Sequence, residues 1–401
     1  MRLPRASGAH LMYCTNVHPG ESLADVRAAI AGDVAAVKAR VSPGAPFAVG
    51  LRLGAEAAEA LGEPRAREDF RALLRDRDLY VVSINGFPYG RFHGARVKET
   101  VYRPDWREPE RLAYTNRLAD LLADLLPEGV EGSISTVPGA FRPDASKIEA
   151  RERIATHIVD HAAVLARIRE ERGPTIALAL EPEPACMIET IDEAIAFFER
   201  HLVSARAARR MAEQAGLGPE EAEEALRRHL GLCVDACHAA VEFEDAGEAI
   251  AKLRAAGLRV AKAQLSVGLR VPDVDDGARA ALAAFAEDTY LHQTVERRGD
   301  TLRRFVDLPE ALAAFDREGI GDPREWRVHY HVPIFRERYG ALESTRPFLE
   351  ELLTLQREAP FTTHLEVETY TWGVLPPALR SAALVDDLAR ELDWARGRLH
   401  G

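Results

Sequence analysis

Short apolar runs alternate with longer amphipathic stretches along most of the chain. The apolar runs have the length of strands, and the amphipathic stretches repeat their apolar residues at helical spacing. The predicted strands cover residues 10–17, 47–53, 79–85, 132–137, 176–183, 230–235, 260–266 and 364–370. The predicted helices cover residues 22–41, 65–77, 108–126, 148–172, 190–201, 247–256, 342–358 and 378–399. Eight alternating units of this kind predict an α/β fold with a parallel sheet closed into a (β/α)8 TIM barrel.

Two stretches depart from the alternation and are predicted to be insertions. Residues 203–229 form a helical pair broken by Gly216 and Gly218. Residues 270–327 hold a helix near 278–285, a hairpin with strands at 289–295 and 302–308, and a short helix at 309–318. We therefore predict a single TIM-barrel domain over 1–401, with insertions at about 203–229 and 270–327. The second insertion separates strands 7 and 8. It is followed by an extra strand at 327–335, which is either a ninth strand or an extension of the seventh.

Composition and charge narrow the class of protein. The 401 residues are 47% hydrophobic, and their formal charge is 52 − 64 = −12. So acidic a chain is a poor partner for nucleic acid or for an anionic membrane. The four cysteines form no CxxC pair, and no apolar run approaches the ~20 residues of a membrane span. No leader peptide is visible, so we expect a cytoplasmic protein without membrane insertion.

Two glutamates follow the most apolar predicted strand. The sequence IALALEPEP places Glu181 and Glu183 on one face of that strand, because side chains alternate with period two. Pro182 and Pro184 end the strand, since proline donates no ladder hydrogen bond. A buried carboxylate needs a partner, a metal or a proton. The competing interpretation is a pair of solvated loop glutamates.

Other predicted strands also end in polar side chains, which a barrel would gather at its carboxyl-end mouth. These are Asn16, His18, Asn85, Tyr89, His93, Asp235, His238, Lys262, Gln264, His329, His331, Glu366 and Glu368. Carboxylates with histidine and glutamine suit a divalent metal with oxygen-rich ligation, such as Mn²⁺, Mg²⁺, Zn²⁺ or Fe²⁺. The D-x-x-H spacing from Asp235 to His238 is weak by itself. Cys233 and Cys237 could join His238 as zinc ligands, although Cys233 fits an apolar strand better.

The motifs ALEPEP, VDACH and LEVET together resemble those of the xylose-isomerase-like TIM barrels. That group includes sugar epimerases and isomerases, inosose dehydratase and DNA-repair enzymes of the endonuclease IV type. In the epimerases, Glu, Asp, His and Glu hold a metal, and the two glutamates act as acid and base. The resemblance implies these roles for Glu181, for Asp235 and for Glu368 or Glu366, and a substrate contact for His238.

The chain departs from that pattern at the third ligand. Gln264, in KAQLS, stands where the family has histidine. Three alternatives follow: Gln264 is itself a ligand, His331 from the extra strand replaces the histidine, or metal binding is lost.

A narrower resemblance extends over nearly the whole chain. The stretches YCTNVHPGE, NGFPYGRFHG, VKETVYRPDW, KAQLS, HQT, RVHYHVPIF and LEVETYTW are similar to the metabolite traffic protein EboE family. That resemblance implies a protein of a bacterial secondary-metabolite cluster, tied to the movement or maturation of a precursor. Other proteins of the same cluster are its expected partners.

Two functions are therefore predicted as alternatives. The first is a metal-dependent sugar or polyol isomerase or epimerase, working by intramolecular proton transfer on a small metabolite precursor. The second is a metabolite-binding or traffic protein that kept the pocket and lost the chemistry. A nuclease is disfavoured by the net charge of −12 and by too few histidines for a three-metal cluster.

Residue roles follow from the first alternative. The predicted catalytic residues are Glu181 and Glu368, and the predicted metal ligands are Glu181, Asp235, Gln264, Glu368 and His331. The predicted substrate-binding residues are His18, Asn16, Asn85, Tyr89, His93, Glu183, His238, Lys262, His329 and Glu366. We expect the loop 86–94 and the segment 271–327 to cover the pocket.

Overall fold

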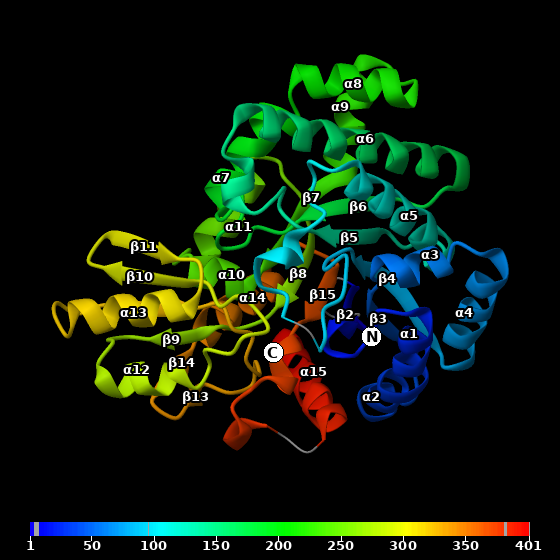
Figure 1. The fold of residues 1–401 in the computed structure, drawn as a ribbon. Coiled ribbons are helices and arrows are strands. Elements are labelled where there is room, and N and C mark those ends of the chain that lie inside the picture. Colours follow the sequence, from blue (N-terminus) through cyan, green and yellow to red (C-terminus); the bar gives the residue numbers. More distant parts are fainter. Residues whose placement is uncertain (4–7, 95, 381–382, 401) are drawn as a thin grey trace.

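A barrel of eight parallel strands forms the centre of the described chain (Figure 1). The computed structural model describes residues 1–3, 8–94, 96–380 and 383–400. The barrel strands are β2 (Ala9–Tyr13), β3 (Phe47–Arg52), β4 (Leu79–Asn85), β5 (Gly132–Thr136), β6 (Ile176–Leu180), β7 (Leu230–Asp235), β8 (Val260–Leu265) and β15 (His364–Val367). Their order is β2-β15-β8-β7-β6-β5-β4-β3, and β1 (Arg2–Leu3) adds antiparallel to β2.

A parallel bridge between Cys14 and Gly50 links β2 to β3, so the sheet is nearly closed. The α/β TIM-barrel prediction is confirmed.

Helices surround the barrel (Figure 1). They are α1 (Leu23–Ala29), α2 (Ala35–Val41), α3 (Ala55–Ala60), α4 (Pro64–Asp76), α5 (Pro109–Leu125), α6 (Ile148–Arg172), α7 (Ile191–Phe197), α8 (Ala205–Ala215), α9 (Pro219–His229), α10 (Ala236–Val241), α11 (Ala246–Ala255), α14 (Arg346–Glu358) and α15 (Leu384–His400). The predicted cap at Ser22 is present, as a capping box with Asp25. Helices α3 and α10 were not predicted, because six residues are too few to show a helical period.

The insertion between β8 and β15 builds a second sheet beside the barrel, on the left in Figure 1. Within the described residues this sheet is antiparallel, in the order β11-β10-β12-β9-β14-β13. Its strands are β9 (Leu269–Val271), β10 (Thr294–Arg298), β11 (Thr301–Phe305), β12 (Glu325–Val328), β13 (Arg338–Tyr339) and β14 (Leu342–Ser344), and its helices are α12 (Asp276–Ala283) and α13 (Leu308–Glu318).

Several predicted boundaries were wrong. The extra strand predicted at 327–335 is β12, which ends at Val328 and pairs with β9 and β10; it belongs to neither the seventh barrel strand nor a ninth. Beyond it the chain leaves the second sheet, and the N–H of Val332 donates to Val267 O. The helix predicted from 342 begins at Arg346, because β14 occupies 342–344.

Two further boundaries lie elsewhere than predicted. The first hairpin strand, predicted at 289–295, is β10, which reaches a tight turn at Gly299, a glycine with φ of 54°. The terminal helix, predicted from 378, begins at Leu384. Residues 381 and 382 of that prediction lie outside the described residues. In the part of the chain that the structure describes, no helix is both long and apolar enough to cross a membrane.

Candidate functional site

A pocket with a cavity volume of about 60 Å³ opens at the carboxyl ends of the barrel strands. Its polar part includes Asn16, Asn85, Ser135, Gln264 and Glu368, and its aromatic part includes Phe87, Phe92, Tyr102, Tyr290 and Tyr370. The aromatic side chains come from the loop after β4, from the insertion and from the segment after β15. The two segments that were expected to cover the pocket therefore both contribute to its lining.

Three carboxylates meet at one point of this mouth. Glu181 follows β6, Asp235 ends β7 and Glu368 follows β15, and one oxygen of each lies within 4.8 Å of the other two. Asn16 donates from Nδ2 to Glu368 Oε1 at 2.7 Å and so fixes that side chain. The structure therefore brings together the three carboxylates that the sequence proposed as metal ligands.

Besides joining the carboxylate cluster, Asp235 is the N-cap of α10. Its Oδ1 accepts the N–H of His238 at 2.9 Å and the hydroxyl of Ser266 at 2.7 Å. Its Oδ2 is buried and has no hydrogen-bond partner among the described residues. The cap thus fixes the carboxylate and leaves one oxygen available to a ligand.

Burial and the neighbouring charged groups shift the pKa values of these three carboxylates. Burial, together with Glu368 and Asp235, raises the pKa of Glu181 well above its usual value. Burial, together with Asp235, raises the pKa of Glu368 in the same direction. Burial alone would raise the pKa of Asp235. His238, His331 and the two hydrogen bonds lower it by more, so the pKa lies below its usual value. A proton or a cation is needed to hold such a cluster together.

His331 supplies a nitrogen to the same cluster. Its Nδ1 donates to Glu368 O at 2.8 Å, so its Nε2 carries the lone pair in the neutral ring. That Nε2 lies 3.9 Å from Asp235 Oδ2, and neither atom has a hydrogen-bond partner among the described residues. Three carboxylates and this imidazole form a donor set that fits Mn²⁺, Mg²⁺, Zn²⁺ or Fe²⁺.

Gln264, the alternative ligand, lines the same pocket. It is in register with Asp235 on β7 and with Glu366 on β15. Its Oε1 accepts a hydrogen bond from Cys233 Sγ at 3.4 Å. Of the two alternatives, His331 has the free ring nitrogen beside the carboxylates.

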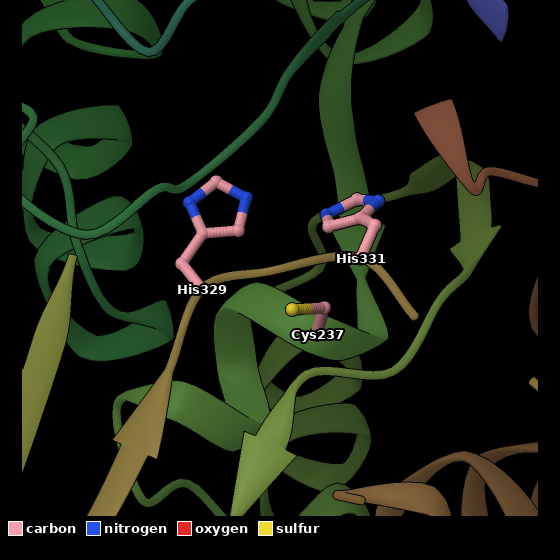
Figure 2. Close-up of side chains that lie close together, drawn as sticks. All are labelled: Cys237, His329 and His331. Atoms are coloured by element: carbon pink, nitrogen blue, oxygen red, sulfur yellow. The ribbon is translucent and has the colours of Figure 1, made fainter. Parts of the chain in front are cut away.

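Glu183 joins a different group of side chains from its neighbour Glu181. A carboxylate oxygen of Glu183 and one ring nitrogen each of His238 and His329 lie within 4.8 Å of one another. Glu183 Oε1 accepts the hydroxyl of Tyr102 at 2.7 Å. Figure 2 shows His329 and His331 on the same side of the segment that follows β12, close to Cys237 of α10.

Lys262 and Glu366 form a fully buried ion pair in the barrel. Lys262 Nζ lies 2.7 Å from Glu366 Oε1, and Asn85 bonds to both side chains. Neither Lys262 nor Glu366 is among the residues that line the pocket, although both were predicted to bind substrate. Asn85 does line it.

Of the other residues that were predicted to bind substrate, some line the pocket and some lie outside it. Asn16, Glu183, His238 and His329 line the pocket. His18, Tyr89 and His93 do not: His18 bonds to Tyr13 at 2.9 Å, Tyr89 packs on Tyr114, and His93 donates to Asn16 O at 2.7 Å. The physical reason is that the loop after β4 turns Tyr89 and His93 into a neighbouring surface hollow, which they line with Glu21 and Arg91.

Sequence reasoning missed several lining residues. Tyr102 and Gln293 hold the Glu183 carboxylate, and Phe92, Tyr290 and Tyr370 pack against one another at the pocket. All five lie outside regular helices and strands of the barrel, so periodicity gave no signal. Four of the five lie in stretches that carry the family resemblance: Phe92 in NGFPYGRFHG, Tyr102 in VKETVYRPDW, Gln293 in HQT and Tyr370 in LEVETYTW. The predicted covering segments 86–94 and 271–327 contain Phe92, Tyr290 and Gln293 but did not single them out.

No family model matches the chain, and no curated protein matches it. A solved xylose isomerase-like TIM barrel protein from Mycobacterium smegmatis, in complex with magnesium, is similar at a TM-score of 0.53 and 14% identity, over 98% of this chain and 97% of that one. The fold is that of the xylose isomerase-like TIM barrels.

Two other solved structures are more distant. A xylose isomerase domain protein from Planctomyces limnophilus has a TM-score of 0.46 and 16% identity, over 88% of both chains. The IOLI protein with a binding zinc atom has a TM-score of 0.42 and 13% identity, over 97% of this chain and 98% of that one.

Proposed function

We propose that this protein is a metal-dependent isomerase or epimerase acting on a small sugar-like or polyol-like metabolite. The observation that carries the proposal is the convergence of Glu181, Asp235 and Glu368 within 4.8 Å, beside the free Nε2 of His331. These four residues would hold the ion. When bound, a divalent cation polarises a substrate carbonyl and its neighbouring hydroxyl.

Glu181 and Glu368 are the proposed proton carriers. They leave β6 and β15, which are separated in the sheet by β7 and β8, so they approach the pocket from different sides. Because burial and the neighbouring carboxylates raise the pKa of both Glu181 and Glu368, one of them can be protonated while the other is ionised. The ionised glutamate takes the proton from the carbon beside the carbonyl, and the protonated one returns a proton to the substrate.

The pocket lining supports a small substrate that has both polar and apolar groups. It combines carboxylates and amides with the aromatic side chains of Phe87, Phe92, Tyr290 and Tyr370. A net charge of −12 supports a small-molecule partner over nucleic acid.

The biological setting is a finer proposal. The motif resemblance supports membership of the metabolite traffic protein EboE family and a place in a bacterial secondary-metabolite cluster, with proteins of that cluster as partners. Four free, buried cysteines support a reducing compartment such as the cytoplasm.

The alternative is a metabolite-binding protein that does no chemistry. The observation that favours it is Gln264, an amide at the position where the family has a histidine ligand, with its oxygen engaged by Cys233.

Deuterium exchange separates the two proposals. The protein loaded with Mn²⁺ is incubated in D₂O with a panel of ketoses, inososes and polyols, and exchange at carbon is followed by NMR. We expect exchange with at least one compound, and a loss of about 10²- to 10⁴-fold in Glu181→Gln and in Glu368→Gln. Glu193→Gln, on the outer helix α7, is the matched control and should keep full exchange.

Unchanged turnover in both glutamine variants would contradict the enzyme proposal. Saturable binding of a compound, with no exchange of its carbon-bound hydrogen in the wild-type protein, would establish the binding alternative.

A further inference from the structure

The last helix of the chain carries a carboxyl group that is buried against the barrel. Helix α15 (red in Figure 1) packs on the outside of the barrel, against α2 and α14. Its Glu391 side chain is fully buried, and the Oε1 atom accepts the hydroxyl of Thr369 at 2.7 Å and the N–H of Ile334 at 3.1 Å. Packing of an outer helix does not need a buried carboxyl group, which is costly to remove from water.

The two bonds of Glu391 reach two different segments, and each segment carries a proposed metal ligand. Thr369 directly follows Glu368, and Ile334 lies three residues after His331. The first segment leaves β15 at the mouth of the barrel, and the second leaves β12 of the second sheet. Glu391 therefore joins a segment of the barrel to a segment of the insertion's sheet at the place where both supply a ligand.

The same two segments are also bonded to each other. His331 Nδ1 donates to Glu368 O at 2.8 Å, and the hydroxyl of Thr371 donates to His331 O. Neither bond uses His331 Nε2 or the carboxylate of Glu368, so both groups stay available to an ion. With the bonds of Glu391 behind them, the two segments are tied together on the side away from the pocket.

We propose that Glu391 is a positioning residue for the carboxylate and imidazole site. It holds the segments behind His331 and Glu368 in place, so that these two ligands reach the other two of the site. The inference rests on the ion site of the proposed function. Contacts behind a metal ligand fix its orientation, and their loss weakens metal binding by about 10- to 100-fold.

The protonation state of Glu391 makes two substitutions informative. Burial raises its pKa from 4.5 to about 8, so the side chain is mostly a neutral acid at pH 7. Glutamine keeps the accepting oxygen and is also neutral. Leucine has a similar volume and cannot accept a hydrogen bond, so Glu391→Leu removes both bonds and Glu391→Gln keeps them.

Gln356 of α14 provides a matched control. It is another buried polar side chain on an outer helix, and its Oε1 accepts the N–H of Phe361 at 3.1 Å and of Thr362 at 3.3 Å. Its Nε2 donates to Thr362 O at 2.8 Å. These residues precede β15, whereas Glu368 follows it. Gln356→Leu therefore removes comparable bonds at the opposite end of the same strand.

Two measurements test the inference. Hydrogen exchange of the metal-free protein, followed by mass spectrometry, reports how firmly the segments 329–334 and 368–372 are held. Titration with Mn²⁺, followed by electron paramagnetic resonance of the free ion, gives the Kd. We expect Glu391→Leu to lose protection in both segments and to bind Mn²⁺ about 10- to 100-fold more weakly. Glu391→Gln should match the wild type in both measurements, and Gln356→Leu should keep the wild-type Kd.

A milder variant covers the case in which Glu391→Leu does not fold. Thr369→Val removes one of the two bonds and keeps the shape of the side chain, so it should weaken Mn²⁺ binding in the same direction. Circular dichroism verifies that each variant is folded.

The results separate this inference from the proposed function. Wild-type Mn²⁺ affinity in folded Glu391→Leu, or in Thr369→Val, would overturn the positioning role and leave the ion site in place. An equal loss of affinity in Gln356→Leu would also overturn it, because general destabilisation would then explain the loss. A wild-type protein that binds no Mn²⁺ would contradict the ion site of the proposed function and overturn the positioning role with it.

Discussion

At the scale of single residues, Glu391 shows how burial alone can couple stability to pH. It lies in α15, and its Oε1 accepts the hydroxyl of Thr369 at 2.7 Å and the N–H of Ile334 at 3.1 Å. Burial raises its pKa from 4.5 to about 8. In the unfolded chain the carboxyl ionises near pH 4.5, so folding loses stability as pH rises from about 4.5 to about 8.

We therefore predict that Glu391→Gln protects the protein at alkaline pH. The amide keeps the accepting oxygen and removes the ionisation, which lowers the free energy of unfolding of the wild type by on the order of 5 kcal/mol across that pH window. The urea midpoint of the wild type should fall between pH 5 and pH 8, and that of the variant should fall less. Equal slopes for the two proteins would show that Glu391 ionises normally in the folded state.

The closeness of three predicted site residues could be expected from the sequence, because each of them stands at the end of a strand. Glu181, Asp235 and Glu368 follow three parallel strands, and closure of the barrel brings such ends together. Gln293 and Tyr102 could not be found in this way, because they come from the insertion and from an irregular loop. His331 was named only as an alternative, since the path of the chain after β12 has no sequence period.

At the scale of elements, the backbone of β3 at Gly50 lies so close to its neighbours in the barrel that no side chain fits there. A Cβ on this β3 residue would lie 1.9 Å from Glu366 Oε2 and 2.6 Å from Tyr13 O. Glu366 is held by Lys262 and cannot move away without breaking a buried ion pair.

Gly50→Ala should therefore destabilise the protein by about 3 kcal/mol. Gly397→Ala, in α15 with no atom within 4 Å of the added carbon, is the matched control and should raise stability by up to about 1 kcal/mol. Denaturant unfolding of both variants measures the difference. A Gly50→Ala protein as stable as the wild type would show that Glu366 can be displaced cheaply.

Long elements were predicted well and short ones poorly. The range predicted for α6 is the observed one, Ile148–Arg172, because 25 residues contain several helical turns of apolar pattern. Strands β13 and β14 have two and three residues, and such lengths carry no readable alternation. Tertiary pairing with β9, and not local sequence, makes β14 a strand.

At the scale of the whole molecule, an ion at the carboxylate site should stabilise the fold. A ligand that binds only the folded chain adds about 2.7 kcal/mol at 100 times its Kd, which raises Tm by a few degrees in a protein of this size. We predict such a rise when Mn²⁺ is added to chelator-treated protein.

Two variants, each at the N-cap of a helix, test whether the rise in Tm comes from this site. Asp235→Asn should lose most of the Mn²⁺ response, whereas Asp245→Asn, at the N-cap of α11, should keep it. Differential scanning fluorimetry measures both. An unchanged Tm in the wild type at millimolar Mn²⁺ would contradict ion binding at this site.

The barrel could be predicted from the sequence because eight strand-helix units in series leave few other arrangements. The second sheet could not be predicted from the sequence. Its strand β12 pairs with β9 and β10, and residues 272–293 separate those two strands in the chain. Antiparallel pairing across such distances depends on the finished packing.

The double role of Asp235 limits how this molecule can change over evolutionary time. One of its oxygens caps the start of α10, and the other is buried without a hydrogen-bond partner beside the proposed metal site. A lineage that abandoned the chemistry would still need a cap here, so asparagine, serine or threonine could replace the aspartate, and alanine would be selected against. The identity of this one residue in related chains would therefore separate descendants that kept a working site from those that kept only the barrel.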